Sequence, residues 1–98
     1  MNIDINGTSV HVSEQGTGHA IIFLHGLGCD GTDWDPQVEA FSTRYRCITI
    51  DHRGHGRSDR IVGDGFSIPG FAADALAVLD HLEVDRAHVV GLSMGGMI

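Results

Sequence analysis

Three short, continuous apolar runs constrain the fold of this chain more than any other feature. They are "AIIFL" at residues 20–24, "RCITI" at 46–50 and "AHVVGLS" at 87–93. Runs of this length without polar alternation are typical of parallel strands that are buried on both faces. Helical patterns separate them, one beginning near Asp35 and one spanning 68–82. Strands that alternate with helices predict an α/β fold, with a parallel sheet covered by helices on both faces.

Local signals define the ends of several elements. Apolar residues alternate on either side of Asn6-Gly7, which predicts an N-terminal hairpin across residues 3–12. Asp35 followed by Pro36 predicts a helix start, with Asp35 as the N-cap. Ser67 is the expected N-cap of the longer helix.

The ends of the three predicted parallel strands lie at one edge of the sheet. The loops that follow them are residues 25–35, 51–60 and 91–96. Ligands of open α/β sheets bind beyond the carboxyl ends of the strands. We therefore expect the functional site to be built from these three loops.

Composition restricts the kind of protein and its partners. The 98 residues are sufficient for one domain, which we place at 1–98, and the formal net charge is −7 with six Arg and no Lys. Such a chain lacks the basic footprint for nucleic acid or an anionic membrane surface. Its start does not resemble a secretory signal and no segment is apolar enough to span a bilayer, so we expect a cytoplasmic location. We expect both cysteines to be free thiols, Cys47 as a buried apolar residue and Cys29 in a loop that places no base beside it.

The stretch "GLSMGG" fits G-x-S-x-G at a strand-to-helix junction. A nucleophilic Ser93 at this place stands clear of the sheet on a sharp, strained turn. The chain two residues before and two residues after the serine is brought close together, so Gly91 and Gly95 avoid a clash between side chains. The N–H of Met94 is the expected donor to an oxyanion.

The stretch "FLHGLGCDG" supports two different interpretations. Glycines at 26, 28 and 31 spell G-x-G-x-x-G, and Asp51 closes the next strand about 20 residues later, as in a dinucleotide-binding oxidoreductase. A pyrophosphate, however, needs glycines that open the helix. Pro36 places the helix start beyond these glycines, and aspartates at 30, 33 and 35 repel a phosphate.

In the second interpretation the same loop supplies an oxyanion donor. Gly26 allows a sharp turn, and the N–H of Leu27 becomes the second donor that an acyl-transfer serine requires. His25 is expected to orient this loop through hydrogen bonds of its ring.

Together these motifs resemble the N-terminal part of an α/β-hydrolase, most of all 3-oxoadipate enol-lactonases and serine-haloperoxidase-like esterases. The resemblance rests on "FLHGLG", on Trp34 and Gln37, on "DHRGHGRSD" and on "VVGLSMGGMI". It covers about residue 5 to 98 and the first third to half of a typical family member. It implies that Ser93 is the nucleophile and that the Leu27 and Met94 amides hold the oxyanion of a small ester or lactone, without a cofactor.

The resemblance also assigns the loop "DHRGHGRSD" to support the site from below the nucleophile, beginning at Asp51. A metal site formed by Asp51, His52 and His55 is an alternative for the same loop. We disfavour it because the family uses no metal and because Gly54 and Gly56 already serve as turn residues.

The chain departs from the family at its end. The triad of α/β-hydrolases runs Ser, Asp or Glu, then His, but the five residues after Ser93 include neither an acid nor a histidine. We therefore expect the fold to be truncated after the serine turn, without base and acid. The serine strand then becomes an apolar edge that favours association with an identical or complementary chain. A hydrolase, an inert half-domain and, more remotely, an oxidoreductase remain as hypotheses.

Overall fold

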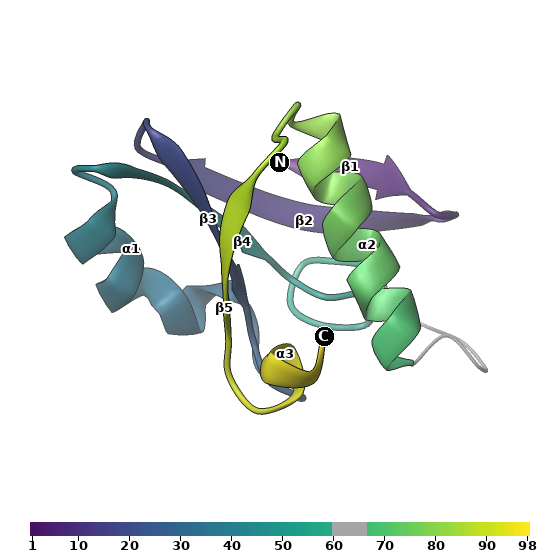
Figure 1. Ribbon diagram of the computed structural model, residues 1–98. Coiled ribbons are helices and arrows are strands. Elements are labelled where there is room, and N and C mark those ends of the chain that lie inside the picture. The colour runs from purple at the N-terminus through teal and green to yellow at the C-terminus, as the bar shows by residue number, and fades with distance from the viewer. Residues whose placement is uncertain (60–66) are drawn as a thin grey trace.

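The centre of the computed structural model, which describes residues 1–59 and 67–98, is a five-stranded mixed sheet in the order β1-β2-β4-β3-β5. The strands are β1 (Asn2–Ile5), β2 (Thr8–Gln15), β3 (His19–Leu24), β4 (Tyr45–Ile50) and β5 (Ala87–Gly91). β3 runs parallel to both β4 and β5, whereas β2 pairs antiparallel with β1 and with β4 (Figure 1). The predicted α/β sheet with its N-terminal hairpin is confirmed.

The β1–β2 hairpin closes through the two-residue loop that the sequence predicts. Ile5 pairs with Thr8 across the loop, and Asn6 and Gly7 adopt φ angles of 46° and 78°. Positive φ at both loop residues defines a type I′ turn, whose twist matches that of the flanking strands.

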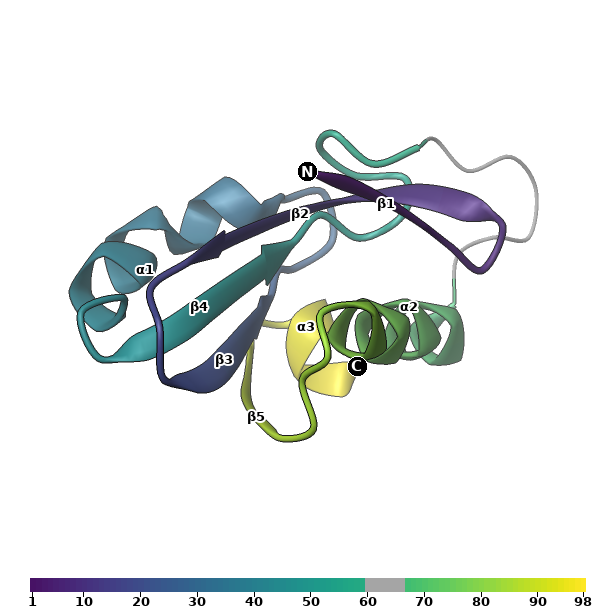
Figure 2. The ribbon, with the colours of Figure 1, turned by 90° about the horizontal axis from the view of Figure 1, so that it is seen from above.

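Helices cover both faces of the sheet, as expected. A short 3₁₀ helix (Gly31–Trp34) leads into α1 (Asp35–Phe41) on one face, while α2 (Ile68–His81) and α3 (Met94–Met97) lie on the other (Figure 2). On the α2 side, Ala75 and Val78 pack against β-strand residues such as Ile22 and Ile48. On the α1 side the core is smaller and consists of Ile21, Phe23 and Cys47, with Trp34, Val38 and Tyr45 against it.

One of the two predicted helix caps is wrong. The chain already turns helically at Gly31, where the carboxylate of Asp30 accepts a hydrogen bond from the N–H of Thr32. Asp35 is therefore the first residue of α1, and Trp34 precedes it without a side-chain cap. Ser67 caps α2 as predicted, because its hydroxyl accepts the N–H of Gly70.

Among the described strands, β5 lies at the edge of the sheet opposite β1, and it pairs with β3 alone. Its expected burial is wrong. Val89 is 62% exposed and Val90 38%, because no strand covers their outer side in the described part of the chain. The apolar edge expected at this strand is therefore present.

The remaining expectations concern loops and cysteines. Cys47 is buried in β4 and Cys29 is partly exposed, and both are free thiols. Residue 60, at the end of the predicted loop 51–60, lies outside the described residues. No helix in the described ranges has the length and hydropathy that crossing a membrane requires.

Candidate active site

Ser93 occupies a strained turn between β5 and α3. Its φ of 55° and ψ of −112° lie in a region that L-residues rarely adopt. A Cβ at Gly91 would overlap the backbone of Gly95, and one at Gly95 would overlap the carbonyl of Leu24. The turn can therefore approach both itself and the end of β3 only because these two positions carry no side chain.

The loop after β3 lies directly against this turn. A Cβ built on Gly26 would stand 3.6 Å from the Cβ of Ser93 and 3.4 Å from the carbonyl oxygen of Leu92. The N–H of Leu92 donates to the carbonyl of Leu24 at 3.1 Å, which extends the hydrogen bonding between β5 and β3 into the turn. The structure thus brings together the two motifs, which are distant in the sequence.

Gly28 rather than Gly26 provides the positive φ of the loop. The N–H of Cys29 donates to the carbonyl of Gly26 at 3.1 Å, and Gly28 between them has a φ of +78°. A turn with positive φ only at its third residue is type II, which favours glycine there. The position in this turn that favours glycine is therefore Gly28, whereas a Cβ at Gly26 would make only ordinary van der Waals contact with Leu92 and Ser93.

The two N–H groups predicted as oxyanion donors have no acceptor within residues 1–59 and 67–98. They belong to Leu27, at the exposed corner of the type II turn, and to Met94, the first residue of α3. Unpaired amides are usually satisfied by solvent or by a bound group. Both predicted donors are therefore unpaired within the described residues, one on the exposed Leu27 and one on the buried Met94.

His25 is fully buried and both of its ring nitrogens bond to the backbone. Nδ1 donates to the carbonyl oxygen of Gly26 at 2.7 Å, and Nε2 accepts the N–H of His52 at 3.0 Å. Burial lowers the pKa of His25 below its ordinary value of 6.5. A neutral ring with both nitrogens occupied positions the loop and cannot also accept a proton from Ser93.

The Asp51 carboxylate joins two of the three loops. Its oxygens accept the N–H of Gly31 at 2.7 Å and the N–H of Arg57 at 2.9 Å. Gly56, with a φ of +49°, allows the backbone to fold against this carboxylate, since a Cβ there would overlap it. Asp51 is 6% exposed, so its oxygens are committed to the protein and not offered to a ribose or a metal.

The amides that a dinucleotide would need are similarly occupied. The N–H of Gly31 bonds to Asp51, and the N–H of Thr32 bonds to Asp30. The helical turn does begin at Gly31, earlier than expected from Pro36, but carboxylates already cap it. These contacts oppose a pyrophosphate at this place.

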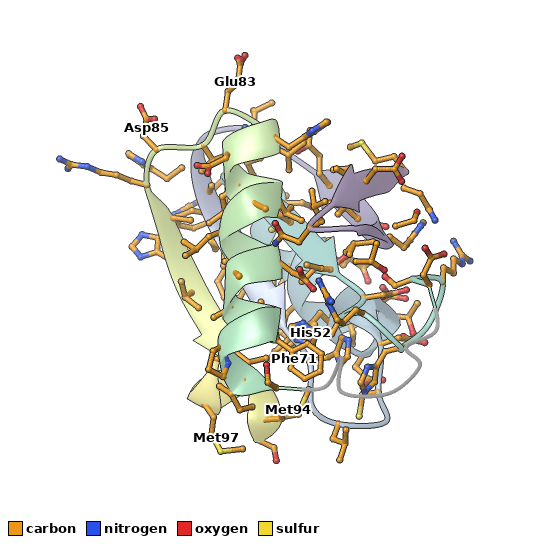
Figure 3. All side chains as sticks on the ribbon, turned by 90° about the vertical axis from the view of Figure 1, so that its right-hand side faces the viewer. His52, Phe71, Glu83, Asp85, Met94 and Met97 are labelled. Carbon is orange, nitrogen blue, oxygen red and sulfur yellow. The ribbon has the colours of Figure 1, made fainter. Side chains whose placement is uncertain are left out.

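The histidines of the loop after β4 form a ring cluster instead of a metal site. The His52 ring lies 4.3 Å from that of His25 and 5.3 Å from that of Phe71, and His55 lies 5.0 Å from His25, measured between centroids. Figure 3 shows His52 and Phe71 together near the N-terminal end of α2. Within the described residues, no group of three acidic, histidine or cysteine side chains could hold a metal ion.

His52 is the most perturbed member of this cluster. Its side chain is fully buried, and neither ring nitrogen has a hydrogen-bond partner in the part of the chain that the structure describes. Burial, with the neighbouring His25 and His55 as further causes, lowers the pKa of His52 from 6.5 to about 4.

An ion pair that the sequence motifs did not predict anchors the same loop. Arg53 Nε and Nη2 donate to the two carboxylate oxygens of Asp74 at 2.6 and 2.7 Å, and Asn6 donates to Asp74 at 3.2 Å. Asp74 is fully buried on the apolar face of α2, three residues after Phe71 and four before Val78. An acid within a helical apolar stripe was the signal that could have revealed it.

Trp34 lines a small cleft beside the site. Its ring packs 5.1 Å from that of Phe23, measured between centroids. The cleft has a volume of about 230 Å³ and is lined by His25, Asp33, Trp34, Gln37 and Leu92. Trp34 therefore borders the space next to the serine turn, with no contact to Ser93 itself among the described interactions.

The sequence is similar to a known protein family and to several of its characterised members. Residues 19–98 match the family model described as the alpha/beta hydrolase fold. The 3-oxoadipate enol-lactonase 1 of Acinetobacter baylyi is 40% identical over 89 residues, which cover 91% of this chain and 33% of that protein. The non-heme haloperoxidase of Rhodococcus erythropolis is 42% identical over 92 residues, covering 93% of this chain and 33% of that protein.

The solved structures agree with this similarity. The enol-lactonase from Burkholderia xenovorans superposes with a TM-score of 0.93 at 36% identity, and the match covers 99% of this chain and 38% of that one. The chain thus spans about a third of the length of the curated relatives that it matches.

Proposed function

The chain belongs to the alpha/beta hydrolase fold family, and from that premise we propose that its residues form the nucleophile and oxyanion part of a serine hydrolase acting on a small ester or lactone. The observation that carries the proposal is the strained Ser93, at φ 55°, beside two N–H groups that lack acceptors. A lactone is supported by the names of two similar proteins, both enol-lactonases.

In the proposed reaction the Ser93 oxygen attacks the acyl carbon and its proton passes to a general base. The carbonyl oxygen becomes an oxyanion that accepts hydrogen bonds from the Leu27 and Met94 amides. Collapse of this intermediate breaks the ester bond, the base returns the proton to the leaving alcohol, and water then releases the acid. His25, Gly26, Gly91 and Gly95 hold the loop and turn in place.

The base in this proposal comes from outside residues 1–98. His25 is excluded because its two ring nitrogens bond to the backbone, and Ser93 has no hydrogen bond to any histidine within the described residues. The acid that orients the base is placed outside as well. Hydrolysis therefore needs a further segment or a complementary chain.

The test is the hydrolysis of p-nitrophenyl acetate by residues 1–98 alone and by residues 1–98 together with a further segment or chain that carries the proposed base and acid, each with Ser93→Ala as the control. We expect turnover that depends on Ser93 only when the segment is present. Turnover by the supplemented protein that survives Ser93→Ala would refute the assignment of the nucleophile. Rapid Ser93-dependent turnover by residues 1–98 alone would refute an external base.

The exposed edge of β5 favours a second candidate for residues 1–98 on their own, namely self-association. Val89 and Val90 are exposed on a strand that pairs on one side only among the described strands, so a second copy can add its own β5 there. Sedimentation should show a dimer that Val89→Lys dissociates, with Leu76→Lys on exposed α2 as the control. A monomeric wild-type chain would rule this out.

A further inference from the structure

The direction of the Leu27 N–H is set by the His25 ring. The carbonyl of Gly26 and the N–H of Leu27 belong to one planar trans peptide unit and point in opposite directions. His25 Nδ1 donates to that carbonyl at 2.7 Å. The Leu27 N–H is therefore directed away from the imidazole.

The same ring is held from its other side by the loop after β4. The N–H of His52 donates to His25 Nε2 at 3.0 Å, so Nε2 carries no proton and Nδ1 carries the proton of a neutral imidazole. His25 thus links two peptide units, Gly26–Leu27 and Asp51–His52.

The peptide unit between Asp51 and His52 is held in turn by Ser58. The Ser58 hydroxyl donates to the carbonyl oxygen of Asp51, which points opposite to the His52 N–H. The Ser58 oxygen accepts the N–H of His11 from β2 at 2.8 Å. A continuous line of hydrogen bonds therefore runs from β2 to the loop after β3.

Every member of this line accepts on one side and donates on the other, in the same direction. Bonds arranged in this way polarise one another, by roughly 10–30% per bond in condensed-phase estimates. His25, Asp51 and Ser58 are all buried, so solvent does not compete within the line. The last donor is the Leu27 N–H, which has no acceptor in the described part of the chain.

We propose that Ser58 is a positioning residue for the Leu27 amide, acting through Asp51, His52 and His25. The hydroxyl fixes and polarises the two intervening peptide units, so that the Leu27 N–H is both aimed and strengthened as a donor. The catalytic role of Ser58 rests on the proposed function, in which the Leu27 amide holds the oxyanion. The series of hydrogen bonds from His11 to Gly26 is independent of that function.

The decisive experiment follows the Leu27 amide by ¹H–¹⁵N NMR in Ser58→Ala. We expect its proton resonance to move upfield, as in a weaker donor, and to return toward the wild-type position in Ser58→Thr, which keeps the hydroxyl. Ser67→Ala is the matched control, since it removes a serine hydroxyl that caps α2 and has no contact with the line. A Leu27 resonance that shifts equally in both alanine variants would overturn the proposal.

A second measurement needs no variant. The ¹⁵N resonances of the His25 ring report which nitrogen carries the proton, and we expect the neutral form protonated at Nδ1. A ring protonated at Nε2 at neutral pH would break the line at His52 and overturn the proposal.

The activity assay separates this proposal from the proposed function. In protein that hydrolyses p-nitrophenyl acetate, Ser58→Ala should lower kcat about two- to eightfold with KM unchanged, because one oxyanion donor is worth about 10²–10³ and the line contributes roughly 10–30% of its free energy. If no ester is hydrolysed, the proposed function fails, and the NMR result still decides the role of Ser58.

Discussion

The buried ring of His52 should make the folded protein sensitive to acid. An unfolded chain gains a proton on this histidine near pH 6.5, whereas the folded protein does so only near pH 4, because burial disfavours the charged ring. Between these values the unfolded state binds more protons, so the free energy of unfolding falls as the pH falls. Above pH 6.5 the histidine is neutral in both states and has no such effect.

The size of the effect follows from the two pKa values. A difference of about 2.5 units at 1.36 kcal/mol per unit gives a loss of at most about 3 kcal/mol, complete near pH 4. This is a large part of the stability of a small domain, which is about 5–15 kcal/mol. His25, whose pKa is also lowered by burial, adds to the loss in the same direction.

Urea denaturation at several pH values between these limits measures this dependence. His52→Leu has an apolar side chain that does not titrate, and it also removes two buried nitrogens without partners, so the variant should be as stable as the wild type or more stable at neutral pH. Its stability should fall much less toward pH 4. Exposed His81→Gln on α2 is the control and should keep the wild-type slope. An unchanged slope in His52→Leu would refute the reasoning.

Three further substitutions test the packing around the site by urea denaturation. Gly95→Ala should cost about 1–3 kcal/mol because the new Cβ overlaps the backbone of β3. Gly96→Ala should be close to neutral, since its Cβ would make only ordinary van der Waals contact with the backbone of Gly91; equal costs would contradict the close approach. Gly28→Ala meets no neighbour and should cost about 1–2 kcal/mol from its positive φ alone, so a stabilised variant would argue against the type II turn. Asp74→Ala should cost about 3–5 kcal/mol, since it leaves Arg53 without its buried partner, and the same change in the exposed Glu14–Arg46 pair should cost less than about 1 kcal/mol.

Periodicity and turn chemistry were sufficient to predict the sheet and the loops that meet at its edge. The apolar runs identified β3, β4 and β5, and Asn6-Gly7 identified the hairpin, because each signal is local and the structure satisfies it locally. The helix start near Asp35 was misjudged because a 3₁₀ turn with its own cap, Asp30, precedes it.

Contacts between distant segments could not be predicted from the same signals. The carboxylate of Asp51 binds amides in two different loops, and Asp74 binds Arg53 from another element. Neither partner lies at a spacing that a helix or strand would show. The exposure of β5 likewise depends on which strands and helices pack beside it, and the apolar composition of the strand alone does not predict those neighbours.

The parallel pairing of β3 with β5 determines when in folding the serine turn can form. Ala20 is paired with Ala87, so the chain must close a long loop before this part of the sheet gains any hydrogen bond. The hairpin and the β3–β4 pair need shorter closures and can form earlier. Synthesis on a ribosome proceeds from the N-terminus, so one edge of β3 remains unpaired until β5 has been made. The loop after β3 can therefore pack against the serine turn only late in synthesis.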